Sequence, residues 1–277
     1  MTPEAATCRP VREGLAAGTA YRVCGAGEPL VFIHGVGMNK EVWEPQVSAF
    51  AADYRVISYD MLGHGGSVLP PEAPTLGDYA RQLARLLDAL DIGAANVVGH
   101  SMGALVALAF ALDHPERVLR LVALNAVYQR SAEQREAVIS RATALAVCGV
   151  GDTVEGTLSR WFGDGQDGRQ AEQAARIRAW LQAVDPVGYA RTYRLFATAD
   201  DAVADRLHTL RVPALFMTGE HDPNSTPAMS QNMAAATPMG RVLVVPGERH
   251  MMAYAAPERI NPLLRQFLSE TAARLQC

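Results

Sequence analysis

The stretch VVGHSMGALVALAFAL, residues 97–112, decides the fold of this 277-residue chain. An apolar run stops at the five residues GHSMG and then resumes for about three turns of helix. The first run is typical of a strand buried on both faces of a parallel sheet, and the second of a buried helix. The pattern predicts a strand at residues 96–98 and a helix over residues 101–112, with Ser101 at the sharp turn between them.

Similar short apolar runs recur along the chain, and helical patterns separate most of them. Seven further runs predict strands at residues 11–15, 20–23, 29–33, 55–59, 119–124, 214–217 and 242–245. The first two of these should form a hairpin through residues 16–18. Apolar residues at helical spacing predict helices over residues 75–90 and 261–275. This alternation indicates an α/β fold: a mostly parallel, eight-stranded sheet with helices on both faces.

Residues 128–210 break the alternation, because they contain helical patterns and no strand signal. The four helices are predicted at residues 131–147, 153–161, 170–184 and 186–197. An all-helical insertion between two core strands is expected to form a cap over the C-terminal edge of the sheet. We therefore divide the chain into a core domain, residues 1–127 and 211–277, and a helical cap, residues 128–210.

Ser101 stands in a G-x-S-x-G pattern between a predicted strand and a predicted helix, which is the context of a nucleophile elbow. In such a turn a strained backbone lifts the serine hydroxyl clear of both elements, and small residues such as Gly99 and Gly103 relieve the crowding beside it. The simpler alternative is that Ser101 only caps the following helix. The sequence favours a nucleophilic serine.

A serine hydroxyl needs an adjacent base, and in this arrangement the order along the chain is serine, acid, histidine. Asp222 follows one of the last two predicted strands and His250 follows the other. We predict that Asp222 orients His250 and that His250 activates Ser101. Both could instead be ordinary polar loop residues. The other common position for the acid, at the end of strand 119–124, carries Asn125, which favours Asp222.

Two backbone N–H groups, those of Val36 and Met102, are predicted to form an oxyanion hole. Val36 lies in the loop after strand 29–33, and Met102 directly follows the nucleophile. His34 begins the same loop and is expected to position it. We place His34 and His100 among the candidate substrate-pocket residues.

Composition excludes several classes of function. The net charge is −4 with no long run of one sign, so neither nucleic acid nor a membrane surface is expected as a partner.

The four cysteines are scattered, and no set of histidines and acidic residues has metal-ligand spacing, so we predict neither a metal nor another cofactor. The N-terminus lacks the apolar segment of a signal peptide, and we expect a cytoplasmic protein. The oligomeric state is left open.

Five motifs together resemble the α/β-hydrolase superfamily. They are HGVG (34–37), DMLGHGGS (60–67), GHSMG (99–103), GEHD (219–222) and GERH (247–250). They run in order from the third predicted strand to the last predicted helix, so the resemblance covers nearly the whole chain. It implies a Ser–Asp–His triad. A serine at the nucleophile position excludes the haloalkane dehalogenases and epoxide hydrolases of this superfamily, which use aspartate there.

Within the superfamily, residues 42–67 look like the 3-oxoadipate enol-lactonase branch, and so does the stretch from Trp161-Phe162 through residues 184–194. We place Trp161 and Phe162 among the candidate pocket residues. If the substrate carries a carboxylate, an arginine of the cap such as Arg191 or Arg194 is expected to bind it.

The predicted function is that of a serine hydrolase that opens a carboxylic ester or lactone of a small organic substrate through an acyl-enzyme. An enol-lactone is the leading specific substrate. Carbon–carbon bond hydrolysis of a ring-cleavage product uses the same serine and stays open, as does the chemistry of serine perhydrolases. A ligand receptor built on a hydrolase scaffold is the alternative without catalysis.

Overall fold

A computed structural model describes residues 11–164 and 168–270 of the chain. Within this part, eight strands form one sheet in the order β1-β2-β4-β3-β5-β6-β7-β8. The strands are β1 (Arg12–Ala16), β2 (Thr19–Cys24), β3 (Glu28–Ile33), β4 (Tyr54–Tyr59), β5 (Ala95–His100), β6 (Val118–Leu124), β7 (Ala214–Gly219) and β8 (Gly240–Val245). The β1–β2 and β2–β4 pairs are antiparallel and all other pairs are parallel, as expected from the sequence.

Helices cover both faces of this sheet. The α-helices are α1 (Glu44–Phe50), α2 (Leu76–Ala89), α3 (Met102–Asp113), α4 (Ala132–Cys148), α5 (Val154–Phe162), α6 (Gly168–Gln182), α7 (Pro186–Thr198), α8 (Pro227–Ala236), α9 (Met252–Ala255) and α10 (Pro257–Leu268). Short 3₁₀ helices are η1 (Lys40–Trp43), η2 (Pro115–Arg117), η3 (Gly151–Thr153) and η4 (Ala204–Thr209). Apolar side chains of α2, α3 and α8 share one core cluster, and those of α1 and α10 share a second. Along β3, Val31 and Ile33 face the first cluster, whereas Leu30 and Phe32 face the second, as the twofold period of a strand requires.

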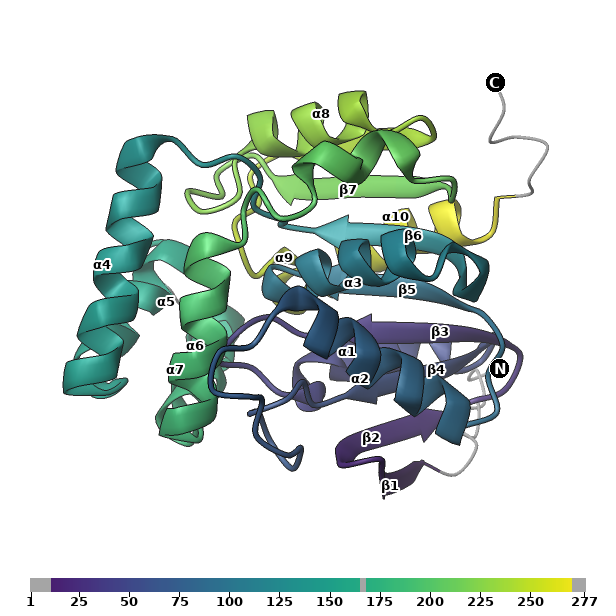
Figure 1. The fold of residues 1–277 in the computed structure, drawn as a ribbon, viewed down its shortest axis with the longest axis horizontal. Helices are drawn as coiled ribbons and strands as arrows, with labels where there is room; N and C mark the ends of the chain where they lie inside the picture. The colour runs from purple at the N-terminus through teal and green to yellow at the C-terminus, as the bar shows by residue number, and fades with distance from the viewer. Residues whose placement is uncertain (1–10, 165–167, 271–277) are drawn as a thin grey trace.

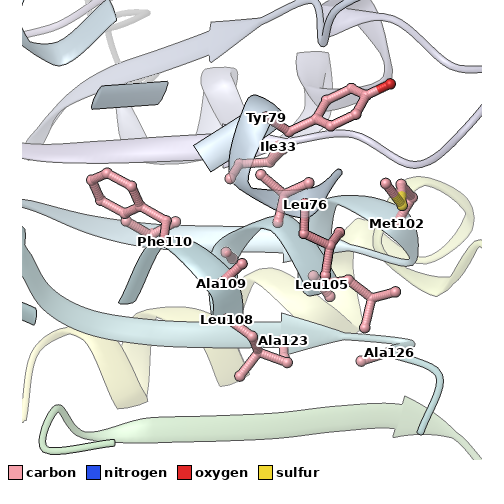
Figure 2. Packing of buried hydrophobic residues seen from close by; sticks show 14 of the residues in the cluster. Ile33, Leu76, Tyr79, Met102, Leu105, Leu108, Ala109, Phe110, Ala123 and Ala126 are labelled. Atoms are coloured by element: carbon pink, nitrogen blue, oxygen red, sulfur yellow. The ribbon is translucent and has the colours of Figure 1, made fainter. Parts of the chain in front are cut away.

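Helix α3 lies at the centre of the first cluster. Its residues from Met102 to Ala111 are all buried. Figure 2 shows Leu108 of this helix beside Ala123 of β6, and Leu105, Phe110 and Ile33 of β3 belong to the same cluster. Burial on every side anchors the helix firmly, so its N-terminus holds a fixed position at the carboxyl end of β5.

In the turn from β5 into α3, the backbone at Gly99 packs against that at Gly103, and the backbone at Gly103 packs against that of Ile33 in β3. A Cβ atom at Gly99 would lie 2.1 Å from the carbonyl oxygen of Gly103, and one at Gly103 would lie 2.3 Å from that of Ile33. No larger residue fits at either place without a backbone shift. The two glycines of GHSMG are therefore required by close packing of the turn against itself and against β3.

Helices α4–α7 are inserted between β6 and β7, where the sequence predicts a helical segment. Figure 1 shows them gathered beyond the end of the sheet to which the arrowheads of β6 and β7 point. Helix α7 is tied to the core by the Tyr79–Thr192 hydroxyl pair, 2.7 Å apart, and by a bond from Arg191 to the Pro70 carbonyl oxygen. The division of the chain into a core domain and a cap domain stays a prediction.

The predicted strands and helices are found with shifts of a few residues. The largest shift concerns the last helix, which was expected over residues 261–275. Helix α10 begins earlier, at Pro257, because proline is well suited to the first turn of a helix, and it ends at Leu268. Residues 271–277 lie outside the described part. In the described residues no helix has both the length and the apolar character needed to cross a membrane.

The close packing at Gly103 predicts a large effect of a single methyl group. We expect Gly103→Ala to lower the free energy of unfolding by about 1–3 kcal/mol, because the new Cβ would meet backbone carbonyl groups that cannot rotate away. Gly93→Ala is the matched control, since a Cβ there meets nothing within 4 Å, and it should change stability by less than about 0.5 kcal/mol. Urea denaturation of both variants checks this. Equal stability of the two variants would contradict it.

Candidate active site

Ser101 occupies a strained position between β5 and α3. Its φ is 55° and its ψ is −116°, a conformation that L-residues with a side chain rarely adopt. Its N–H donates to the Leu124 carbonyl oxygen of β6 at 2.8 Å, which fixes the turn to the neighbouring strand. Ser101 stands at the N-cap position of α3, but its side chain accepts no capping hydrogen bond, so the alternative that it serves only to cap the helix lacks the bond it requires. The hydroxyl is left available for chemistry.

Asp222 and His250 meet beside this turn, from the loops after β7 and β8. The Nδ1–H of His250 donates to Asp222 Oδ2 at 2.7 Å, and both side chains are almost completely buried. Burial contradicts the alternative that either is an ordinary surface-loop residue. This bond assigns the proton to Nδ1, so Nε2 is the ring nitrogen free to accept a proton. His250 and Ser101 line the same cavity, although this structure forms no hydrogen bond between their side chains.

Asp222 is held as a carboxylate by several donors. Burial raises the pKa of its carboxyl, but the neighbouring His250 and hydrogen bonds from Asn125 and Asn224 outweigh burial, and the pKa lies below its ordinary value. The Asn125 amide donates to Asp222 Oδ2 at 2.8 Å, the same oxygen that His250 contacts. Asn125 therefore helps to orient the acid. In the sequence, Asn125 is notable only because it stands where a carboxylate could have served as the acid. Its position at the end of β6 is the one sequence feature that points to the site.

Two aromatic side chains fix the His250 residue from other directions. The indole of Trp161, on α5, stacks on the His250 ring with centroids 5.7 Å apart and planes 29° from parallel. The Nε2–H of His100 donates to the His250 carbonyl oxygen at 2.8 Å. Burial lowers the pKa of His100 to about 3, so its ring is neutral and able to make this contact at neutral pH.

The loop after β3 approaches Ser101 closely. A Cβ atom at Gly35 would lie 3.3 Å from the Ser101 Cβ, and the next residue, Val36, lines the cavity. Among the described residues, the N–H groups of Val36 and Met102 donate to no other protein group. The structure thus places two unengaged amides near the serine, and their role as an oxyanion hole stays a prediction.

Two buried histidines clamp this loop on either side of Val36. The Nδ1–H of His34 donates to the Gly35 carbonyl oxygen at 2.8 Å, and the Gly37 N–H donates to His64 Nε2 at 3.0 Å. Burial lowers the pKa of His34 to about 3, helped by the nearby His64, and lowers that of His64 to about 4. Both rings must be neutral, because His34 Nε2 accepts the Met61 N–H at 2.9 Å and His64 Nε2 accepts the Gly37 N–H, so their burial and their hydrogen bonds agree.

The cavity in front of Ser101 has walls from the core and from the helical insertion. It encloses about 810 Å³ outside the protein atoms, with the open solvent at its mouth included. The described residues that line it are Val36, Ser101, Arg130, Gln134, Ala137, Val138, Arg141, Thr157, Arg160, Trp161, Tyr193, Phe196, Pro223, Asn224 and His250. Three arginines and no acidic residue stand among them, which makes the cavity strongly cationic.

These three arginines were missed by the sequence reasoning. Arg160 donates to the Thr157 hydroxyl at 2.9 Å and Arg141 donates to the Tyr193 hydroxyl at 3.4 Å. Burial and the neighbouring Arg141 charge lower the pKa of Arg160. Neither Arg141 nor Arg160 forms an ion pair with an acidic group of the described chain. Two guanidinium groups that repel each other without a counter-ion are suited to an anionic ligand.

Four candidate pocket residues lie elsewhere than expected. His34 is buried beneath the loop and His100 lines a separate small cavity beside Trp43. Phe162 belongs to the second core cluster, because it follows Trp161 on α5 and points to a different side of that helix. Arg191 turns away toward the Pro70 carbonyl oxygen. Of the pocket residues expected from the sequence, only Trp161 faces the cavity.

The described residues contain no group of three or more histidine, cysteine, aspartate or glutamate side chains arranged to hold a metal ion. The polar groups of the residues that line the cavity are guanidinium, hydroxyl and amide groups and the imidazole of His250.

The geometry is that of a hydrolase elbow, and comparison with known proteins agrees. The family model described as the alpha/beta hydrolase fold matches residues 28–257. The chain belongs to this family. The superfamily resemblance read from the five motifs is thereby confirmed.

Individual relatives of this hydrolase carry more specific names. The chain is 40% identical over 247 residues to the (E)-2-((N-methylformamido)methylene)succinate hydrolase of Acinetobacter baylyi, covering 89% of this chain and 92% of that protein. It is 33% identical to 3-oxoadipate enol-lactonase 1 of the same organism, covering 71% and 72%. The crystal structure of the enol-lactonase from Burkholderia xenovorans superimposes with a TM-score of 0.86 at 28% identity, covering 94% of this chain and all of that one.

The buried neutral histidines predict that the free energy of unfolding decreases as the pH is lowered. Between pH 6.5 and about 4 the unfolded hydrolase binds protons at His34, His64 and His100 that the folded protein does not. Their contribution is fully present above pH 6.5 and is lost as the pH falls. Each adds at most about 1.4 kcal/mol per pH unit. Urea denaturation at pH 7, 6 and 5 should show this slope.

His64→Gln should reduce the slope by about one proton. His208→Gln, at an exposed position, is the control and should leave the slope as it is. Identical slopes in the His64 variant and the unchanged protein would contradict the assignment.

Proposed function

We propose that this protein is a serine hydrolase that cleaves an acyl bond of a small organic acid carrying two carboxylates. Ser101 is the nucleophile, His250 the general base and acid, and Asp222 the residue that orients His250. The bond broken is an ester, lactone or amide, because all three pass through the same tetrahedral intermediate.

The cationic cavity is the observation that carries this proposal. Arg130, Arg141 and Arg160 face the same space as Ser101 and His250, and no described acidic side chain lines it. A carboxylate entering the cavity gains charge-assisted hydrogen bonds, whereas a neutral substrate leaves the half-buried Arg141 and Arg160 without an ionic partner. Two of these guanidinium groups, those of Arg141 and Arg160, lack a counter-ion. This favours a substrate with two carboxylates over a substrate with one.

The named relatives are consistent with such a substrate. The relative that is 40% identical is named for a substituted methylenesuccinate, a compound with two carboxylates and an amide. The relative that is 33% identical is named for an enol-lactone of 3-oxoadipate, and the Burkholderia structure is named only as an enol-lactonase. These names suggest organic acids as a class, and the arginines of this chain give a physical reason for the same class here.

The first half of the reaction forms an acyl-enzyme. Ser101 Oγ attacks the carbonyl carbon while its proton passes to His250 Nε2, the ring nitrogen that Asp222 leaves free. The carbonyl oxygen becomes an oxyanion and accepts hydrogen bonds from the N–H groups of Val36 and Met102. The intermediate collapses when the carbon–leaving-group bond breaks and His250 returns its proton to the leaving oxygen or nitrogen.

The second half releases the acid. Water attacks the acyl carbon and gives its proton to His250, and the bond to Ser101 Oγ then breaks as the proton returns to that oxygen. Water is consumed once for each turnover. Asp222 stabilises the imidazolium that forms twice in the cycle, and its hydrogen bond with Asn125 keeps the carboxylate aligned with the ring.

An enol-lactone with a single carboxylate is the second candidate. It is favoured by the likeness to the enol-lactonases, whose structure covers nearly the whole chain. Carbon–carbon bond hydrolysis and ligand sensing without turnover remain as outcomes that the experiments below distinguish.

Removal of the nucleophile tests the chemistry. We expect Ser101→Ala to lower turnover of 4-nitrophenyl butyrate by about 10⁴-fold or more and to abolish labelling by a fluorophosphonate probe. Ser140→Ala, at an exposed site on α4, is the control and should retain both. Absence of labelling and turnover in the unchanged protein would favour a receptor. Labelling without turnover of esters, lactones or amides would favour carbon–carbon bond hydrolysis.

Substitution of one cavity arginine tests the substrate class. The 4-nitrophenyl monoester of succinate and 4-nitrophenyl butyrate have similar length and differ by one carboxylate. We expect the protein to prefer the succinate ester, and Arg160→Gln to lower the ratio of the two kcat/KM values by about ten- to hundred-fold. Arg194→Gln is the control, since Arg194 is exposed on α7 and does not line the cavity. An equal preference for both esters in the unchanged protein would refute an anionic substrate.

A further inference from the structure

Arg130 differs from the other two arginines of the cavity because it has a buried acidic partner. Its side chain is 4% exposed, and that of Asp200, which it contacts at 3.3 Å, is fully buried. Asp200 lies two residues beyond the end of α7, and Arg130 lies two residues before the start of α4. The pair therefore joins the two ends of the helical insertion.

Only one end of the Arg130 guanidinium is engaged by the protein. Its Nη1 donates to Asp200 Oδ1 and to the carbonyl oxygens of Phe196, at 3.1 Å, and Ala197, at 3.4 Å. The Phe196 ring packs beneath the guanidinium, 4.6 Å from its centre. Asp200 Oδ2 also accepts the backbone N–H of Arg130 at 2.8 Å. Backbone and side chain of Arg130 are thus fixed by the same carboxylate.

The other edge of the guanidinium is unoccupied. Nε and Nη2 of Arg130 have no hydrogen-bond partner in the described residues and are not among the fully buried unpaired atoms. Arg130 lines the cavity that contains Ser101, and the Nε–Nη2 edge is the part of its guanidinium that remains for a ligand there. Nε–H and Nη2–H together form the planar fork that binds a carboxylate through both of its oxygens.

We propose that Asp200 is a positioning residue for substrate selectivity, which holds Nη1 of Arg130 so that the Nε–Nη2 edge receives a substrate carboxylate. The inference rests on the proposed function, because it requires an anionic substrate of Ser101. Asp200 does not touch the substrate and acts through Arg130. It also offsets the charge of Arg130, whereas Arg141 and Arg160 form no ion pair with the described acidic residues.

A purely structural role is the competing explanation. Asp200 also accepts from Arg135 of α4, at 2.9 Å, and could simply fasten the two ends of the insertion together. Such a role affects stability and the turnover of all substrates alike. Selectivity between an anionic and a neutral ester separates the two roles, because only a change in Arg130 acts on the carboxylate.

The test compares Asp200→Asn with the matched control Asp201→Asn. Asp201 accepts from Arg135 but not from Arg130, and its side chain is half exposed. With 4-nitrophenyl succinate and 4-nitrophenyl butyrate as substrates, we expect Asp200→Asn to lower the kcat/KM ratio about ten-fold, mainly through a higher KM for the succinate ester. Asp201→Asn should keep the ratio of the unchanged protein.

Variants of Arg130 complete the test. Arg130→Lys keeps the charge but lacks the two-nitrogen edge, and it should reproduce the loss of selectivity even if Asp200→Asn fails to fold. In an Arg130→Gln background, Asp200→Asn should have no further effect on the ratio, because it acts only through Arg130.

Two results would overturn the role of Asp200 while leaving the proposed function intact: an unchanged ratio in Asp200→Asn, or an additional loss in the double variant. Failure of the proposed function looks different, since the unchanged protein would then show no preference for the succinate ester.

Discussion

The backbone contact between the β5–α3 turn and β3 is the constraint on which the site depends. Gly99 and Gly103 allow the turn to close, and the Leu124 carbonyl oxygen holds the Ser101 N–H in place. The positive φ of Ser101 costs free energy of order 1–3 kcal/mol, and it persists because α3 is buried on every side and cannot rotate to relieve it. Ser101, the Met102 amide and the start of α3 are therefore held together as one rigid unit. The other groups of the site, such as His250 and the Val36 amide, are positioned relative to this unit.

The core around the sheet and the helical insertion contribute groups of different charge to the site at Ser101. The core supplies a buried carboxylate, Asp222, below His250, and neutral histidines that hold the loop of Val36. The insertion supplies guanidinium groups from the segment before α4, from α4 and from α5. This division follows from topology: the carboxyl ends of parallel strands meet at one edge of the sheet, and a long connection between β6 and β7 can cover that edge. On the proposed function, changes in the core are therefore expected to alter whether a bond is cleaved, and changes in the insertion to alter which substrate is bound.

The core part of the site could be predicted from the sequence because its signals are local. A buried strand, GHSMG and a buried helix define the elbow within sixteen residues, and the polar residues at the ends of β7 and β8 are few. The arginines could not be predicted in this way. Polar and apolar residues are mixed around helix α4 without one clear apolar face, so its sequence does not show which face meets the cavity, and tertiary packing decides it. Arg191 was chosen on α7, but the tie of that helix to Pro70 turns this side chain away. The contact of Asn125 with Asp222 joins residues 97 positions apart and has no local signal either.

A cationic cavity and an acid–base histidine impose opposite demands, and the buried acids reconcile them. On the proposed function, proton transfer from Ser101 creates an imidazolium in a cavity lined by three guanidinium groups, and these like charges repel one another. Asp222 offsets that charge from one side, and Asp200 already neutralises Arg130. On the proposed function, a substrate with two carboxylates neutralises Arg141 and Arg160 when it binds. The cost of charging His250 is then lowest when the correct substrate is in place, so recognition of the carboxylates also favours the first chemical step. A neutral ester of the same shape leaves both arginines unpaired and is at a disadvantage in chemistry as well as in binding.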